Sequence, residues 1–326
     1  MSGIRWYRLA EGSLGVASAD PALAERFEQI YGDCATEGPG EGPRVICRVT
    51  ECADDSIVVR FDDPEPLDDA RFIEAVFPDR GYAPVPHPLG GVALPLPGSS
   101  HVVRLHDGTL TAPRGSAWQP LAANLAVSRL LRLQRSVMFF HAASVRVGER
   151  GLLACGPKRS GKTTLALSLL ARGHTLLGDE VAALSLSDRA LLPFHRSIAT
   201  REGPSSAAAD SLLLRAGGVT EQFPDGELRT RVAVRRLSGK APAARTPLTT
   251  LLLLRSILPV TRIERVPVRP DLLGALTPLA ASLWDRPAGS VGFRLLGILS
   301  AIRVFEVDAG PPNEVAAMIE HLMENE

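Results

Sequence analysis

The stretch "CGPKRSGKTTLAL", residues 155–167, decides the fold prediction. It contains Gly-x-x-x-x-Gly-Lys-Thr, which is the spacing of a Walker A phosphate-binding loop, or P-loop. The apolar run "GLLAC" precedes it, and the helix-forming run "KTTLALSLLARG" follows it and stops at Gly173. Backbone N–H groups of such a loop and of the following helix N-terminus face bound phosphates. The sequence therefore predicts nucleotide binding by an α/β domain.

The side chains of this loop have distinct predicted tasks. The compact ammonium of Lys162 would hold the β- and γ-phosphates, and the Thr163 hydroxyl would bind Mg²⁺. A chance glycine-rich turn before a helix is the alternative, which the strand and the helix on either side disfavour. The predicted nucleotide-binding residues of the loop are Gly156, Pro157, Lys158, Arg159, Ser160, Gly161, Lys162, Thr163 and Thr164.

An acidic pair follows the loop after one helix and one strand. The segment "HTLLGDEVAAL" puts Asp179 and Glu180 at the end of an apolar run, 17 positions after Lys162. Consecutive elements tend to be neighbours in space, so we expect the pair beside the loop. One carboxylate could hold Mg²⁺ and the other could accept a proton from an attacking hydroxyl. A hairpin turn between two strands would also favour Asp here, and both interpretations put the pair at a strand end.

Length and charge indicate a globular chain with room for more than one domain. The 326 residues include 36 basic and 36 acidic side chains, so the net charge favours no polyanionic partner. Residues 1–85 hold 8 basic and 17 acidic residues, whereas residues 196–269 hold 13 basic and 6 acidic ones. This asymmetry separates an acidic N-terminal part from a basic later part.

The organisation predicted from local patterns has three parts. Residues 1–85 read as a mixed α+β accessory domain, with a helix around 21–33 and strands in "PRVICRVT" and "SIVVRF". Residues 86–118 read as a linker and a β-hairpin, because "HVVRLHDGTLTA" alternates around an Asp-Gly turn. Residues 119–326 read as the P-loop domain, beginning with a helix in "PLAANLAVSRLLRLQRS" and two strands at about 137–147 and 151–155.

Other features favour a reduced cytoplasmic protein. The first residues contain no apolar signal region, and the longest apolar run, near "LTTLLLLRSILPV", is short and interrupted by Arg255. The four cysteines include no Cys-x-x-Cys pair, which argues against a zinc site. We expect no membrane or nucleic-acid partner, and a homo-oligomer stays open.

Three blocks, "FHAASV", "GPKRSGKTTLAL" and "LLGDE", resemble the HPr kinase/phosphorylase family in their order. The short span between loop and acid pair also separates the chain from common ATPases and GTPases. The likeness covers roughly residues 120–326 and is strongest to HPr-kinase-related proteins of bacterial gene clusters. It implies an α/β P-loop kinase core of the HPr kinase C-terminal and phosphoenolpyruvate carboxykinase-like type.

The resemblance implies transfer of the γ-phosphate of ATP, with Mg²⁺, to a serine hydroxyl of a small protein or peptide. By position, Asp179 matches the family's catalytic acid/base, and Glu180 matches its acidic neighbour. The implied metal-binding set is Thr163, Asp179 and Glu180. His141 matches a histidine near the phosphates and, with Asp179 and Lys162, completes the catalytic set. Arg196 and Arg201 would approach nucleotide or substrate phosphate.

The chain also departs from that family. The Gly-Leu-Gly-Ile type block after the acid pair is absent, which disfavours the reverse dephosphorylation and HPr itself as the acceptor. The basic run at 229–245 reads either as a mobile arm for an acidic partner or as an exposed polar hairpin. A small-molecule kinase, a plain NTPase and a non-catalytic nucleotide-binding protein all stay open.

Overall fold

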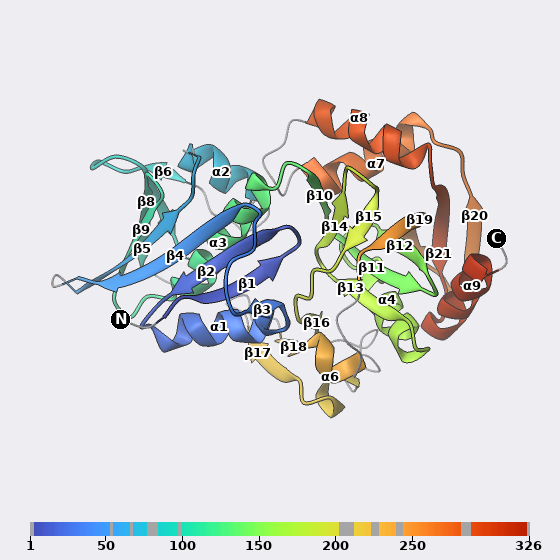
Figure 1. The fold of residues 1–326 in the computed structure, drawn as a ribbon, viewed down its shortest axis with the longest axis horizontal. Coiled ribbons are helices and arrows are strands. Elements are labelled where there is room, and N and C mark those ends of the chain that lie inside the picture. Colours follow the sequence, from blue (N-terminus) through green and yellow to red (C-terminus); the bar gives the residue numbers. More distant parts are fainter. Residues whose placement is uncertain are drawn as a thin grey trace. The chain divides into compact units, whose positions relative to one another are not determined.

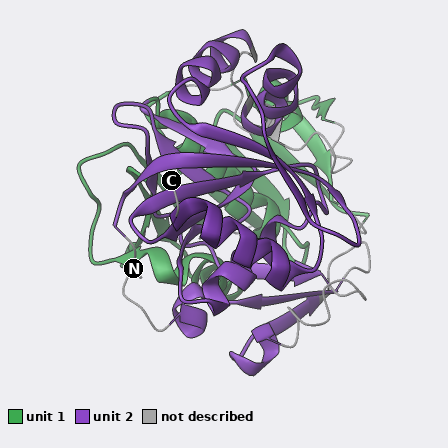
Figure 2. Ribbon diagram, turned by 90° about the vertical axis from the view of Figure 1, so that its right-hand side faces the viewer, with its two compact units in different colours: residues 1–135, 224–226, 282–285 green, residues 136–223, 227–281, 286–326 purple. Residues whose placement is uncertain are grey.

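The computed structural model describes residues 3–52, 55–65, 68–76, 84–96, 100–201, 212–222, 228–238, 244–281 and 288–324, and it is a mixed α/β structure with several mixed sheets (Figure 1). Contacts between Cα atoms divide it into two compact units (Figure 2). The described residues up to Arg135 form unit 1, and those from Ser136 on form unit 2.

Unit 1 contains a nine-stranded sheet in the order β3-β1-β2-β4-β5-β9-β8-β7-β6. Its helices are α1 (Pro21–Tyr31), α2 (Asp69–Val76) and α3 (Gln119–Leu133), with a short 3-10 turn, η1, at Gly32–Cys34. Its strands are β1 (Arg5–Leu9), β2 (Gly12–Ala17), β3 (Ala35–Thr36), β4 (Arg44–Glu51), β5 (Ser56–Asp62), β6 (Val85–Pro86), β7 (Val92–Pro95), β8 (Val102–His106) and β9 (Thr109–Pro113).

Alternation along β4, β5, β8 and β9 gives this part of the unit 1 sheet one apolar and one polar face. Val59 and Leu110 are fully buried and lie opposite each other, whereas Arg60 between buried neighbours is exposed. Helix α3 packs on β2 and β4, and α1 packs on α3. The predicted helix at 21–33, the strands at 44–51 and 56–62 and the hairpin with its Asp107–Gly108 turn are all present.

A buried arginine holds α3 to the rest of unit 1. Arg129 is 2% exposed and donates to Asp63 at 2.8 Å and to Asp69 at 2.9 Å. Its guanidinium also lies over the rings of Phe61 and Phe72, 5.1 and 5.6 Å from their centroids. The sequence pattern grouped this helix with the loop domain from residue 119 on, but its contacts group it with unit 1.

Unit 2 is built on the sheet path β10-β14-β15-β19-β12-β11-β13, with β21 also paired to β19 and β20 to β21. Its helices are α4 (Lys162–Ala171), α6 (Val234–Ser238), α7 (Pro270–Ala281), α8 (Ala288–Leu299) and α9 (Pro312–Glu324). The strands of that sheet are β10 (Val137–Phe140), β11 (Ala142–Val147), β12 (Arg150–Cys155), β13 (Thr175–Gly178), β14 (Ala182–Ser185), β15 (Ala190–Leu192), β19 (Thr246–Ile257), β20 (Arg262–Arg265) and β21 (Arg303–Ala309). A separate three-stranded sheet joins β16 (Ile198–Arg201), β18 (Leu228–Val232) and β17 (Val219–Gln222).

Both faces of the unit 2 sheet are buried, which explains the continuous apolar runs. Leu152 and Ala154 of β12 join the core that also holds side chains of α4 and α9. Leu153 and Cys155 point to the other core, which holds side chains of α7 and α8. Strands covered on both faces need apolar residues at every position rather than alternate ones.

Two strand pairs meet near the end of β12, which leads into the phosphate-binding loop. β10 pairs with β14, and β11 pairs with β13, so the chain stays paired on both sides of His141 and of Asp179–Glu180. The sequence pattern predicts one strand over 137–147, whereas the structure interrupts it at His141. Glu180 lies in the turn between β13 and β14 and has φ of 64°, a conformation that non-glycine residues seldom adopt.

The predicted linker and basic run are only partly described. Residues 97–99 of the predicted linker and hairpin segment and 239–243 of the basic run lie outside the described residues. The described part of the basic run is ordered secondary structure, with β18 and α6, and Arg231 in it is 5% exposed. Among the described residues, no helix is both long and apolar enough to cross a membrane.

Candidate active site

Strand order brings three separated segments to one edge of the unit 2 sheet. β11 lies between β12 and β13 and is antiparallel to both, so β12 and β13 end at the same edge. Ala142 pairs with Cys155, and Ser144 pairs with Gly178. The residues just beyond these pairs, at positions 141, 156 and 179, therefore meet at this edge.

The loop between β12 and α4 has the backbone that its glycines predict. Gly156 has φ of 154°, and a Cβ there would lie 2.5 Å from the Leu254 carbonyl oxygen. Gly161 caps α4 with φ of 93°, and Arg159 has φ of 68°. The loop thus curls over the end of β12 and leads directly into the helix N-terminus, as a phosphate-binding loop requires.

Lys162 is the buried cation of this loop. It is 7% exposed, and its Nζ donates to the carbonyl oxygens of Gly156 at 2.9 Å and Pro157 at 2.8 Å. Burial lowers its pKa, and the negative charges on nearby groups such as Asp179 oppose that shift. The ammonium is held at the mouth of the loop, where it can exchange carbonyl oxygens for phosphate oxygens.

Asp179 faces the loop and is joined to it by a hydrogen bond. The Thr163 hydroxyl lies 3.0 and 3.2 Å from the two Asp179 carboxylate oxygens, to which it donates. Asp179 is 4% exposed. Burial, helped by the Glu180 charge, raises its pKa to about 6, although Thr163 and Lys162 oppose the shift. A carboxylate with this pKa titrates close to neutral pH and suits general-base work.

Glu180 forms an ion pair with an arginine. Its carboxylate oxygen lies 2.7 Å from the Arg196 guanidinium. Burial alone would raise the pKa of Glu180, but Arg196 and Arg231 outweigh it and lower the pKa to about 2. The two adjacent acids therefore have opposite pKa shifts, which is a pattern of divided roles in catalytic sites. Asp179 is the candidate base, and Glu180 stays an anion.

His141, which lies between β10 and β11, contacts the turn that holds Asp179 and Glu180. Its Nδ1 lies 3.2 Å from the Glu180 carbonyl oxygen, and its backbone N–H donates to Leu279 at 3.0 Å. Burial and the Lys162 charge lower its pKa, which favours the neutral ring. A carbonyl only accepts, so the contact places the proton on Nδ1 and leaves Nε2 as an acceptor.

The two predicted arginines, Arg196 and Arg201, occupy different places in unit 2. Phe194 forms an isolated bridge with Gly178, which brings Arg196 beside Glu180. Arg201 lies at the end of β16, opposite Arg229 of β18. The ion pair with Glu180 puts Arg196 at the acidic pair.

Arg231 was not singled out by the sequence pattern. It is 5% exposed and donates to Glu221 at 2.9 Å and to the Ser197 hydroxyl at 3.1 Å. Its charge also acts on Glu180. Arg231 belongs to the basic run at 229–245, in which the sequence does not distinguish it from its neighbours. The register of β18 in its separate sheet selects Arg231, and this register depends on long-range pairing.

The remaining loop residues divide by exposure. Pro157, Lys158 and Arg159 are exposed, and Thr164 is half-buried. Ser160 is 5% exposed, and its hydroxyl has no hydrogen-bond partner among the described residues. An unpaired buried hydroxyl in a loop of this shape is suited to an acceptor that a ligand brings.

The residues at this edge fit a Mg²⁺ ion shared with phosphates. Thr163 and Asp179 offer hard oxygen ligands within 3.2 Å of each other. Mg²⁺ often takes one or two protein oxygens and draws the rest from water and substrate phosphates. The described residues contain no cluster of three or more His, Cys, Asp or Glu suited to a metal.

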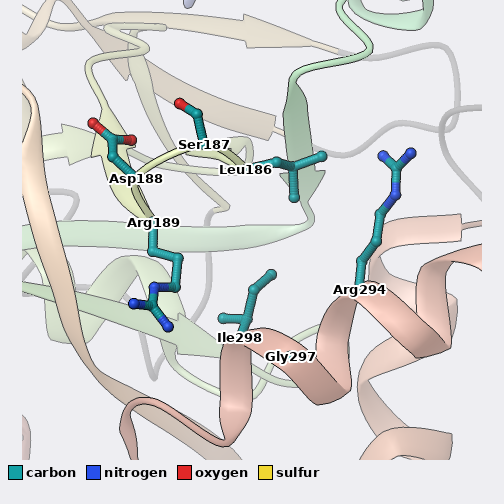
Figure 3. Close-up of a pocket in the computed structure, with 7 residues that line it drawn as sticks. All are labelled: Leu186, Ser187, Asp188, Arg189, Arg294, Gly297 and Ile298. Atoms are coloured by element: carbon teal, nitrogen blue, oxygen red, sulfur yellow. The ribbon is translucent and has the colours of Figure 1, made fainter.

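A hollow elsewhere in unit 2 is separate from this edge (Figure 3). Its volume is about 550 Å³, and it lies between the β14–β15 turn and α8, with Arg189 and Arg294 on either side of Ile298. The turn is paired with the start of β19 near Pro247, whereas Cys155 is paired with Leu253. Six strand residues correspond to about 20 Å, so the hollow is not part of the loop site.

Comparisons with known proteins give little further information. No protein-family model matches the chain, and no curated protein matches its sequence. Among solved structures, the HPr(Ser) kinase/phosphatase from Coxiella burnetii is similar over 57% of this chain and 94% of that chain, with 18% identity and a TM-score of 0.28. This is a distant structural similarity, and at this TM-score it carries no argument about activity.

Proposed function

We propose that the chain is an ATP- and Mg²⁺-dependent kinase that transfers the γ-phosphate to a hydroxyl, most simply a serine of a small protein or peptide. The observation that carries this proposal is the hydrogen bond from Thr163 to Asp179 at 3.0 Å. It joins the hydroxyl expected at the metal to a buried carboxylate with a raised pKa. Nucleotide binding alone needs no such base.

Binding of the nucleotide is assigned to the loop and its lysine. The N–H groups at the start of α4 and the Lys162 ammonium face the same space, where negative charge is favoured. The Mg²⁺ ion would be held by Thr163 and, through water, by Asp179, which leaves the Asp179 carboxylate available as a base, and it would neutralise charge on the phosphates. Lys162 is the right cation here, because a compact ammonium can contact two phosphates at once.

Asp179 is assigned the role of the base that accepts the proton from the acceptor hydroxyl. Its pKa of about 6 leaves it ionised at neutral pH while keeping it basic enough to accept a proton. The Glu180–Arg196 ion pair neutralises the second acid beside Asp179. His141, with its proton on Nδ1, supports the same turn through the Glu180 carbonyl.

The test measures transfer directly. The chain is incubated with labelled ATP, Mg²⁺ and candidate Ser-containing peptides, small proteins and metabolites, and phosphorylated products are identified by mass spectrometry. We expect acceptor-dependent transfer in the wild type and none in Lys162→Ala. Phosphate release at one rate with or without acceptor would identify an NTPase instead. ATP binding without turnover across all acceptors would support the non-catalytic alternative.

A further inference from the structure

The polar face of the unit 1 sheet carries aligned cations and hydroxyls. Register places Arg48, Arg60, Thr109 and His106 side by side in one row across β4, β5, β9 and β8, which lie together in Figure 1. The next row along the strands contains Thr111 and Arg104. Cross-strand neighbours on one face have Cβ atoms about 4.5–5.5 Å apart, so these groups form one compact cluster.

Two arginines of this row stand directly opposite each other. Like charges in that position destabilise a strand pair unless each is neutralised. Arg48 is neutralised by Asp62, whose carboxylate accepts from its Nε at 2.8 Å. In the described part of the chain, Arg60 has neither a hydrogen-bond nor an ion-pair partner, and it is exposed. Arg60 therefore presents an uncompensated guanidinium on the polar face of the sheet.

That guanidinium lines a hollow of about 390 Å³ on the polar face. Ligand sites commonly begin at about 300 Å³, so the hollow fits a small molecule rather than a protein segment. Arg104 is fixed at its rim by hydrogen bonds to the Gly90 and Leu89 carbonyl oxygens. The lining residues are Arg60, Arg104, His106, Asp107, Thr109 and Thr111.

The polar groups of this lining are mostly donors. The guanidinium groups only donate, and the two threonine hydroxyls have no hydrogen-bond partner among the described residues and can donate as well. Asp107 is the single carboxylate in the lining, and it stands in the β8–β9 turn with φ of 48°. A tetrahedral anion with several acceptor oxygens matches two cations beside two hydroxyls better than a cation or a neutral ligand does.

We propose that this hollow, which lies in unit 1 and outside the loop site, binds the phosphate group of a small phosphomonoester or inorganic phosphate. Arg60 would supply a two-pronged contact, and Thr109 and Thr111 would fill the remaining oxygen positions. The site is independent of the kinase proposal, because none of its residues belongs to unit 2.

The test is calorimetric titration of the full-length chain with inorganic phosphate, with glycerol 3-phosphate and with succinate. The Lys162→Ala background is used so that the loop site does not contribute. We expect both phosphates to bind and succinate to bind at least about tenfold more weakly. Arg60→Gln should weaken phosphate binding by about 10- to 100-fold, as expected for loss of a charge-assisted contact. Thr111→Val, which keeps strand shape and charge, should weaken it by about fivefold.

Arg48→Gln is the matched control, because it removes the same charge from the same row but outside the lining. It should change the phosphate affinity by less than about threefold at fixed ionic strength. Equal losses in Arg48→Gln and Arg60→Gln would mean general surface attraction and overturn the proposal. So would the absence of binding at about 10 mM phosphate, or succinate binding as tightly as phosphate. Tighter binding of glycerol 3-phosphate than of inorganic phosphate would support an organic phosphate as the ligand.

Discussion

Gly156→Ala tests whether the loop shape, and not only its lysine, holds the nucleotide. The new Cβ would lie 2.5 Å from the Leu254 carbonyl oxygen and 2.6 Å from the Ser160 hydroxyl, at a backbone φ of 154°. Positive φ costs a non-glycine residue about 1–2 kcal/mol, and overpacking costs about 1–3 kcal/mol more. β19 cannot move aside, because Leu254 is 1% exposed and its strand is paired on both sides.

The loop must therefore shift, and its N–H groups leave their phosphate-facing positions. A cost of about 3 kcal/mol expressed in binding corresponds to an ATP affinity about 100-fold lower. Calorimetry measures this affinity, and urea unfolding shows whether the fold is kept.

Gly173→Ala is the control for positive φ without a clash. Gly173 has φ of 94° with nothing within 4 Å of a Cβ, and it follows the end of α4, about 15 Å from the loop. The Gly173→Ala variant should lose at most about 2 kcal/mol of unfolding free energy and keep the ATP affinity of wild type. An ATP affinity of Gly156→Ala within about threefold of wild type would refute the assigned loop conformation.

Three further outcomes are expected. Because burial raises the pKa of Asp179 to about 6, its carboxyl should titrate near pH 6 by NMR in the Mg²⁺-free protein, and added Mg²⁺ should lower that pKa; titration near the ordinary value of about 4 without Mg²⁺ would contradict this. Since Asp179 has a folded pKa above its ordinary value, its ionisation opposes folding, so wild type should lose about 2–3 kcal/mol of stability relative to Asp179→Asn between about pH 4 and 7 in urea titrations. Arg129→Met leaves Asp63 and Asp69 buried without their cation and should cost about 3–5 kcal/mol in urea unfolding, with a loss under 1 kcal/mol counting against its role.

Local signals predicted the elements around the loop well. The strand at 150–155, the loop and the helix from Lys162 follow from apolar runs and glycines that act within a few residues. The Asp107–Gly108 hairpin and the helix at 21–31 are equally local, since turn chemistry and helical spacing decide them.

Features that depend on long-range pairing were not predicted. The break at His141 has no local marker, because its apolar neighbours on both sides read as one strand. α3 is apolar around much of its surface, so its sequence does not say which unit it packs on, and its packing on β2 and β4 and the Arg129 ion pairs reveal it. The division of roles between Asp179 and Glu180 likewise depends on Arg196 and Arg231, which other strands supply.

The most direct test of phosphotransfer compares wild type with Asp179→Asn, which keeps the volume but removes the charge and the proton acceptor. Two quantities are measured on each: MgATP affinity by calorimetry, and phosphate transfer to Ser-containing acceptors by mass spectrometry. Asp179 as the base predicts a transfer rate lower by about 100-fold or more, with MgATP binding kept within about tenfold. Undiminished transfer by Asp179→Asn would contradict it and leave Glu180 or His141 as the base to test.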